Sequence, residues 1–201
     1  MTPSNDEAGL GGRLPLLRRA DLSGAQQTLW DRTEASMGRW ADEVGFRSKS
    51  ADGRFIGPFN PNLRSPEIAL SLLQFQIDEA KHTSLSERVR QVIILSVGSV
   101  WKAPYELYAH AAAAKHAGLS DQCVAALIEG APSPELAEEE GTAQRLALAL
   151  TEEHAVDDAL YAEARERFGE RGLVDFAILA GCYHLVCGLL NLFVVPAPKA
   201  R

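Results

Sequence analysis

The sequence predicts an all-α protein. No stretch of its 201 residues alternates apolar and polar side chains over the length of a strand, whereas apolar residues recur at three- and four-residue spacing. Serine or proline stands at most of the predicted helix starts, and glycine at several of the ends. With 46% hydrophobic and 23% charged residues, the chain can bury a core of its own. We expect one helical domain at 21–201, preceded by a mobile N-terminal arm at 1–20 that is rich in Gly, Pro and charge.

The first predicted helix is capped by Ser23 and ends at Gly45. A loop at 46–64 follows, and its length inside a compact domain is more typical of a functional loop than of a simple connection. The remaining helices are predicted from Ser65-Pro66-Glu67 with serine as the cap, from Glu87 to about Lys102, from Pro104 to His116, from Ser120 to near Gly130, at about 135–153, from Asp157 to Phe168, and near 172–192. The fold thus has about seven to eight helices.

Composition excludes several classes of function. A formal charge of -7 disfavours a polyanion-binding surface, so we expect no nucleic-acid partner. The three cysteines are an odd number without a C-x-x-C pair, which fits neither a disulfide scaffold nor a zinc ribbon and suits a reducing cytoplasm. No H-E-x-x-H motif or Cys/His cluster is present, so no metal site is expected. The N-terminus shows no secretory signal pattern.

The segment from Phe176 to Val195 lacks Asp, Glu, Lys and Arg over a length that could span a bilayer. It also contains polar side chains, among them His184 and Asn191, which are costly inside a membrane. We therefore predict a core helix that is buried on every side within a soluble homo-oligomer, and no membrane partner.

Candidate chemistry centres on Glu106 and His110. Residues four apart share one face of a helix, so this carboxylate and imidazole can touch and form an acid–base pair in which the carboxylate favours the protonated ring. From spacing alone, an ordinary helical ion pair is the commoner explanation. The position of the pair just after Pro104, among Trp101 and Tyr105, favours a functional site.

In this region the sequence resembles the carboxymuconolactone decarboxylase family of the alkylhydroperoxidase D-like superfamily. The resemblance covers roughly residues 55 to 198. It rests on the order and spacing of several short segments, namely Gly57-Pro58-Phe59, Arg64-Ser65-Pro66-Glu67, the helix from Ser86 to Val97, the segment from Trp101 to His110, Ala117-Gly118-Leu119-Ser120, 169–174 and 189–193.

The resemblance implies an all-helical, cofactor-free subunit that assembles as a homotrimer or homohexamer. The redox branch of the superfamily has a Cys-x-x-Cys before the histidine, where this chain has Ala103 and Glu106, so dithiol peroxidase chemistry is not expected. Family members usually have a glutamate nineteen residues before the histidine, where this chain has Gln91. A carboxamide cannot exchange a proton as a carboxylate does, so a relay that needs a carboxylate at this position would be broken unless Glu87 replaces it.

The first functional hypothesis is therefore cofactor-free decarboxylation of a small carboxylated lactone or related cyclic acid. His110 would be the general acid or base, Glu106 would orient it, and Tyr105, Trp101 and Phe59 would wall the pocket. The cations nearest in sequence for an anionic substrate are Arg54, Arg64 and Lys102.

Other interpretations stay open. The chain could be a non-catalytic or regulatory oligomer that lost its relay at Gln91, or a lactone isomerase, cyclase or hydrolase that uses the same pair. His184 is predicted either as a hydrogen-bonded core residue or as a minor part of the site.

Overall fold

A computed structural model describes residues 9–199, and the part of the predicted arm at 1–8 lies outside the described residues. Its α-helices are α2 (Gly24–Thr33), α3 (Arg39–Val44), α4 (Phe59–Asn62), α5 (Pro66–His82), α6 (Glu87–Trp101), α7 (Pro104–His116), α8 (Asp121–Ile128), α9 (Glu138–Leu148) and α10 (Asp158–Leu192). Within 9–199 there is no strand, only an isolated bridge between Lys49 and Phe55. The all-α prediction is confirmed.

Helix ends follow the local sequence signals with one exception. The side chains of Ser23, Ser86 and Ser120 each accept a hydrogen bond from a backbone N–H in the first turn of α2, α6 and α8. The prediction that Ser65 caps α5 is wrong: its side chain makes no capping hydrogen bond. Pro66 at the first position, which needs no donor partner, begins that helix instead.

Two helical regions contain an irregular turn, and both agree with the predicted segments, one helix from Ser23 to Gly45 and two helices at 157–168 and 172–192. A π-helical turn, Glu34–Gly38, connects α2 directly to α3, so 24–44 forms one irregular helical rod. The predicted helices at 157–168 and 172–192 are the two halves of α10, and Gly169 separates them with φ 65° and ψ 178°, a conformation that favours glycine.

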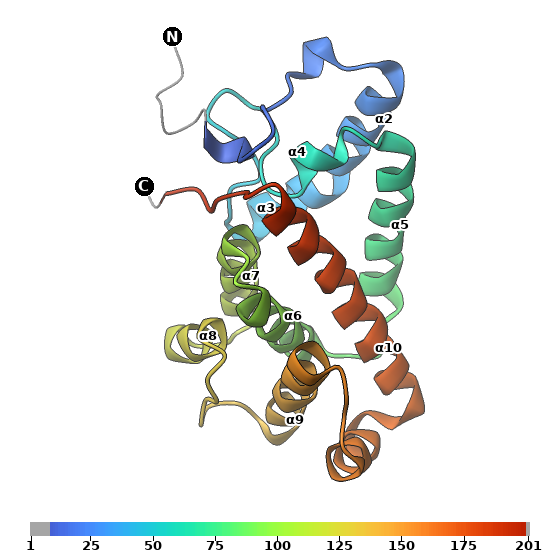
Figure 1. The fold of residues 1–201 in the computed structure, drawn as a ribbon, viewed down its shortest axis with the longest axis vertical. Coiled ribbons are helices and arrows are strands. Elements are labelled where there is room, and N and C mark those ends of the chain that lie inside the picture. The colour runs from blue at the N-terminus through green and yellow to red at the C-terminus, as the bar shows by residue number, and fades with distance from the viewer. Residues whose placement is uncertain (1–8, 200–201) are drawn as a thin grey trace.

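Helix α6 is the centre of the molecule. It packs against α7, α8, α9 and α10, and its residues from Val89 to Gly98 are all buried. In Figure 1, α10 crosses the front of the molecule, with α5 on one side and α7 on the other. In the single chain α10 leaves Ile178, Leu185 and Leu192 exposed, so the predicted burial of the 176–195 segment on every side requires a neighbouring subunit.

The described part of the predicted N-terminal arm is packed rather than loose. Leu10 and Leu16 are buried. The backbone of Arg13 donates to the carbonyl of Phe193 at 2.7 Å, and its guanidinium donates to Leu192 at 2.9 Å. Both ends of the described chain therefore meet beside the end of α10 (Figure 1).

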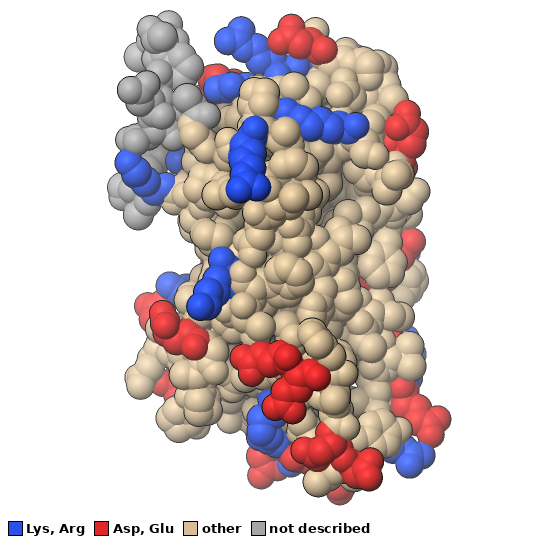
Figure 2. Space-filling model, in the orientation of Figure 1, with Lys and Arg blue, Asp and Glu red and all other residues tan. Residues whose placement is uncertain are grey.

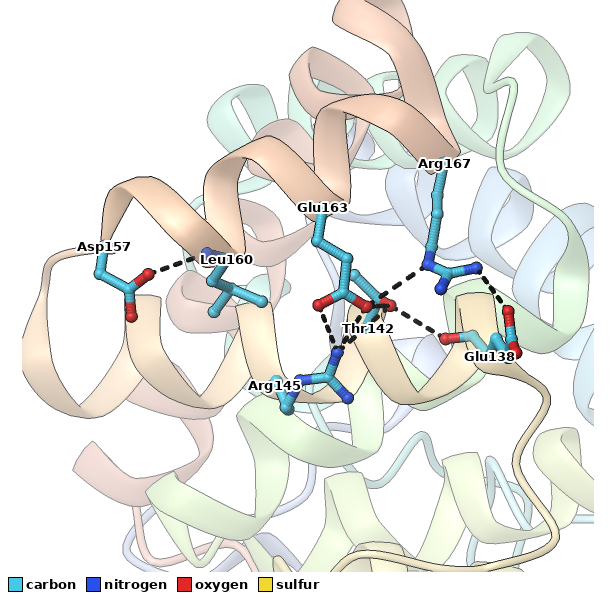
Figure 3. A network of polar contacts seen from close by, with 7 residues as sticks. All are labelled: Glu138, Thr142, Arg145, Asp157, Leu160, Glu163 and Arg167. Carbon is cyan, nitrogen blue, oxygen red and sulfur yellow. Dashed lines mark hydrogen bonds and ion pairs between the residues drawn. The ribbon is translucent and has the colours of Figure 1, made fainter.

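A polar network fastens the first half of α10 to α9 (Figure 3). The carboxylate of Glu163 accepts hydrogen bonds from Thr142 at 2.6 Å and from Arg145 at 2.6 and 2.7 Å. Arg167 extends the network to Glu138 at 3.1 Å. Asp157 caps the same helix by accepting from Leu160 N–H at 2.8 Å. These contacts hold the segment before Gly169 against the bundle.

Candidate active site

A cavity of about 570 Å³ lies between the 24–44 rod, α5, α6, α7 and α10. Its walls are mainly apolar and aromatic, with Met37, Trp40, Phe59, Ile94, Tyr105 and Tyr183 among the lining residues. Polar groups enter from α5, α6 and α7. A largely apolar chamber with a few convergent polar side chains is the usual form of a small-molecule site.

His110 is held between two side chains on the cavity wall. Its Nδ1 lies 2.8 Å from Oε1 of Gln91, and its Nε2 lies 3.1 Å from Oε1 of Glu106. The ring also contacts Tyr183 edge-on, with centroids 5.0 Å apart. The structure therefore brings together His110, Glu106 and Gln91, the three predicted catalytic residues.

The hydrogen-bond chain determines the tautomer of His110. Gln91 donates from Nε2 to Glu87 at 2.7 Å, and because an ionised carboxylate only accepts, the amide must present Oε1 to His110. Nδ1 of the neutral ring therefore carries the hydrogen. Nε2 keeps its lone pair and faces Glu106.

Burial makes this pair neutral. It raises the pKa of Glu106 to about 8, and burial together with the positive charge of Arg90 lowers the pKa of His110 to about 3. At pH 7 the site therefore holds a carboxylic acid beside an uncharged imidazole. The expected carboxylate and protonated ring are not found, because neither charge is solvated at this depth.

One oxygen of the acid is unsatisfied. Oε1 of Glu106 is buried and forms no hydrogen bond of adequate geometry with any described residue, although Nε2 of His110 is 3.1 Å away. A buried polar atom without a partner is costly, and a catalytic role is one of the reasons for which proteins keep such an atom. The acid of Glu106 and the unprotonated ring nitrogen of His110 thus lie side by side on the cavity wall.

Arg90 is the site residue that sequence reasoning missed. It lines the cavity from α6, and its guanidinium reaches Glu79 at 2.5 Å and Glu87 at 2.8 Å. The available signal was its place three residues after Glu87 among the apolar residues of the predicted 87–102 helix, because an arginine on a buried helix face requires charged partners.

The cations proposed from sequence lie elsewhere. Arg54 pairs with Asp52 at 2.9 Å, and Arg64 donates to the carbonyls of Asn60 and Pro15 at 2.8 and 2.6 Å. Lys102 ends α6 in a left-handed conformation with φ 49°. None of the three lines the cavity. Arg54 and Arg64 instead tie the 46–64 loop to itself and to the N-terminal segment.

The predicted aromatic walls divide into two groups. Phe59 and Tyr105 line the cavity, and the Tyr105 hydroxyl donates to the carbonyl of Arg47 at 2.7 Å. Trp101 and His184 do not line it. They form a separate contact in which Trp101 Nε1 donates to His184 Nδ1 at 3.2 Å. His184 is therefore a hydrogen-bonded packing residue, the first of the two interpretations, and its predicted minor role in the site is not supported by its position.

Gly57 explains how Tyr105 reaches its place. A Cβ at Gly57 would lie 2.2 Å from Cε1 of Tyr105, and the backbone there has φ 64°. Any other residue would both clash with the ring and strain the loop. The 46–64 loop thus sets one wall of the cavity. Among residues 9–199, no group of three or more His, Cys, Asp or Glu side chains converges as a metal site would require.

The comparisons with known proteins reveal the fold. The sequence matches no protein-family model and no curated protein. Solved structures do match: an uncharacterized peroxidase-related protein from Ralstonia eutropha JMP134, described as an alkylhydroperoxidase AhpD core, aligns with a TM-score of 0.72 and 15% identity over 93% of this chain and 92% of its own. The chain has the alkylhydroperoxidase D-like fold.

Two further structures with this fold align over nearly the whole chain. An uncharacterized peroxidase-related protein from Silicibacter sp. TM1040 has a TM-score of 0.70 and 18% identity over 100% of this chain and 95% of its own. A debrominase, solved with 2,3,4-tribromopyrrole, has a TM-score of 0.68 and 15% identity over 92% and 90%. At these sequence identities the similar structures establish the fold of this chain, and its chemistry must be argued from the residues of the site.

The cysteines give the first prediction. Cys182 lines the cavity, but burial raises its pKa to about 12, so it is a thiol and not a nucleophilic thiolate at neutral pH. We expect replacement of Cys123, Cys182 and Cys187 by alanine to leave turnover in place and the unmodified protein to show no dithiol-dependent peroxidase activity. Peroxide consumption with a dithiol reductant measures the second point. Loss of turnover in a folded triple variant would contradict the first.

Proposed function

We propose that the chain is a cofactor-free acid–base enzyme that acts on a small cyclic carboxylated substrate, with decarboxylation of a lactone acid as the reaction. The observation that carries the proposal is the neutral pair at the cavity wall, in which the acid of Glu106 and the free Nε2 of His110 face the same chamber. Such a pair can take up one proton and deliver another without a metal or an organic cofactor.

The reaction requires little from the protein beyond placement and a proton. When the substrate carboxylate leaves as carbon dioxide, its bonding electrons remain on carbon and are stabilised as an enolate by a conjugated carbonyl. Glu106 then supplies its proton to that carbon and becomes a carboxylate. His110 takes up a proton from solvent at Nε2 and stabilises the Glu106 carboxylate, to which it then returns a proton for the next turnover. The apolar walls strengthen these interactions, because charge is poorly screened there.

The geometry favours this class over a non-catalytic oligomer. A purely structural role gives no reason for an unsatisfied acid and an uncharged imidazole on the wall of a large cavity. A lactone isomerase or hydrolase could use the same pair, and the debrominase of this fold was solved with a small ring compound. Carbon dioxide release from a panel of carboxylated lactones by the purified protein tests the decarboxylase directly. Ring opening or isomerisation without gas release would assign the alternative chemistry.

The pH dependence of turnover gives the second prediction. Glu106 is an acid only below about pH 8, so kcat/KM should fall as the pH rises through that value. The amide in Glu106→Gln cannot supply a proton, so we expect turnover to be about 10²-fold lower. The remaining activity of this variant should no longer fall as the pH rises through about 8. Glu166→Gln, on the exposed surface of α10, is the matched control and should keep the unmodified profile.

The same shift has a consequence for stability with a definite sign. The folded pKa of Glu106, about 8, lies above its ordinary value of 4.5, so folding is favoured by this group at low pH and loses that contribution as the pH rises from about 4.5 to about 8. In denaturant unfolding, the free energy of unfolding of Glu106→Gln should fall less than that of the unmodified protein between about pH 4.5 and about pH 8. Parallel curves for the two proteins would contradict the neutral assignment.

We also propose that the protein is a soluble homo-oligomer in which a second copy covers α10. An apolar stripe defined by Val174, Ile178, Leu185 and Leu192 is exposed along this helix. Figure 2 shows a broad face with little charge at its centre, more Lys and Arg than Asp and Glu toward the end that carries α2 and α4, and more Asp and Glu toward the opposite end. Two copies packed antiparallel about a two-fold axis would bring opposite charges together, an arrangement that a hexamer allows and a simple cyclic trimer does not.

The oligomer gives a further prediction. Leu185→Arg places a charge in the middle of the stripe, and we expect the oligomer to dissociate to smaller species by sedimentation in detergent-free buffer, because an unpaired charge cannot be buried there. Ile68→Arg, at another exposed apolar position on α5, is the control. Although α10 is long and apolar enough to cross a membrane, such a helix also occurs in the core of soluble proteins. Recovery of the protein only in the membrane fraction would contradict the proposal, as would a monomer before mutation.

A further inference from the structure

We infer that the carboxylate of Glu87 occupies the docking position for a carboxylate group of the substrate, and that ligand binding displaces it from Arg90 and Gln91. The inference rests on the proposed function for the identity of the substrate. The docking position itself is defined by contacts within the cavity.

Glu87 bridges two donors with its two oxygens. Its Oε2 accepts from Nη1 of Arg90 at 2.8 Å, and its Oε1 accepts from Nε2 of Gln91 at 2.7 Å. A guanidinium and an amide that converge on one carboxylate form a two-point receptor for this group. All three side chains line the cavity, so a ligand inside it can reach the same donors.

The two partners of Arg90 differ in how easily they can leave. Glu79 is 7% exposed and accepts from both Nε and Nη2, which makes it the permanent counter-ion. Glu87 is 52% exposed and can turn into water at little cost. The exposed partner is therefore the replaceable one, and when it turns away the donors on Nη1 and on the Gln91 amide become free.

The docking position is coupled to the acid–base pair through one amide group. Gln91 contacts Glu87 with Nε2 and His110 with Oε1, so a carboxylate that replaces Glu87 is held one side chain away from the imidazole. The docked group is an anchor and not the leaving carboxylate, because hydrogen bonds lost on departure of carbon dioxide would raise the barrier, so the substrate carries a second carboxylate beside the one that leaves. Gln91, which cannot serve as a base, thus acts here as a donor to the substrate, which a glutamate would repel.

Binding of benzoate and of its uncharged analogue benzamide tests the inference without any turnover. By calorimetry, we expect Glu87→Ala to bind benzoate about five- to tenfold more tightly than the unmodified protein, because the internal competitor and its repulsion are removed. Benzamide affinity should not change. In a crystal structure of Glu87→Ala with benzoate, the carboxylate should lie within hydrogen-bond distance of Arg90 Nη1 and Gln91 Nε2.

Glu166→Ala removes one negative charge at an exposed position and controls for long-range electrostatics. Equal gains in this control and in Glu87→Ala would overturn the inference, and so would equal gains for benzamide and benzoate. Benzoate that binds neither protein, or that binds away from Arg90, would overturn it as well. Inactivity toward lactone acids together with the expected benzoate result would instead refute the proposed reaction and leave the docking position standing.

Discussion

Replacement of His110 by alanine should reduce kcat/KM by about 10²- to 10⁴-fold, the usual contribution of a positioned general acid or base. The ring contacts both the acid of Glu106 and the amide of Gln91, so its removal takes away the group that stabilises the Glu106 carboxylate after proton transfer. Turnover of whichever lactone acid the screen identifies, measured under saturating and limiting substrate, separates the loss in kcat from any change in KM.

His82→Ala is the matched control for this variant. His82 is exposed at the end of α5 and lies outside the cavity, so turnover should be unaffected. Truncation of His110 also leaves space beside Trp40 and Tyr183, and circular dichroism should verify that the variant is folded. A folded His110→Ala protein with normal turnover would remove the proposed mechanism.

Loss of Arg90 should produce the largest change in stability. The side chains of Glu79 and Arg90 are 7% and 10% exposed, and a buried carboxylate without its cation typically costs about 3–5 kcal/mol of unfolding free energy. We therefore expect Arg90→Met to lose about that amount by urea denaturation. Arg90→Met combined with Glu79→Leu should recover most of it, because a well-packed apolar pair avoids both desolvation costs.

Arg167→Met is the control for that experiment. Its partner Glu138 is 85% exposed, and an exposed pair of this kind contributes less than about 1 kcal/mol. If Arg90→Met loses no more unfolding free energy than Arg167→Met, the assignment of Arg90 and Glu79 as a buried ion pair is wrong. If the double variant is as unstable as the single one, the cost comes from packing and not from the stranded charge.

The helical architecture was largely predictable because its signals are local. Ser86 and Ser120 cap helices through contacts three residues away, Gly45 ends α3 with a positive φ, and the apolar spacing identifies the buried side of α6. Glu106 and His110 were predictable as a pair for the same reason, since four residues is one turn of α7.

Other features depend on contacts between distant segments. Arg54, Arg64 and Lys102 are close to the aromatic segments in sequence but point to the loop, the N-terminal segment or solvent, whereas Arg90 reaches the cavity from α6. Trp101 lies one turn before Tyr105 across Pro104, yet it packs beside α10 and not in the cavity. The neighbouring residues in the sequence do not reveal which of these side chains faces the cavity, because that depends on which helix packs beside each of them.

The sequence by itself determined the helices, their order, and the acid–base pair on one helical turn, because capping, periodicity and i, i+4 contacts act within a few residues. Only the tertiary structure decided the protonation of that pair, since burial by α5, α6 and α10 makes Glu106 an acid and His110 an uncharged base. It also decided which cation faces the cavity and which side of α10 remains exposed. The desolvation of a titratable group depends on all the segments packed around it, and the residues adjacent in sequence do not determine which segments those are.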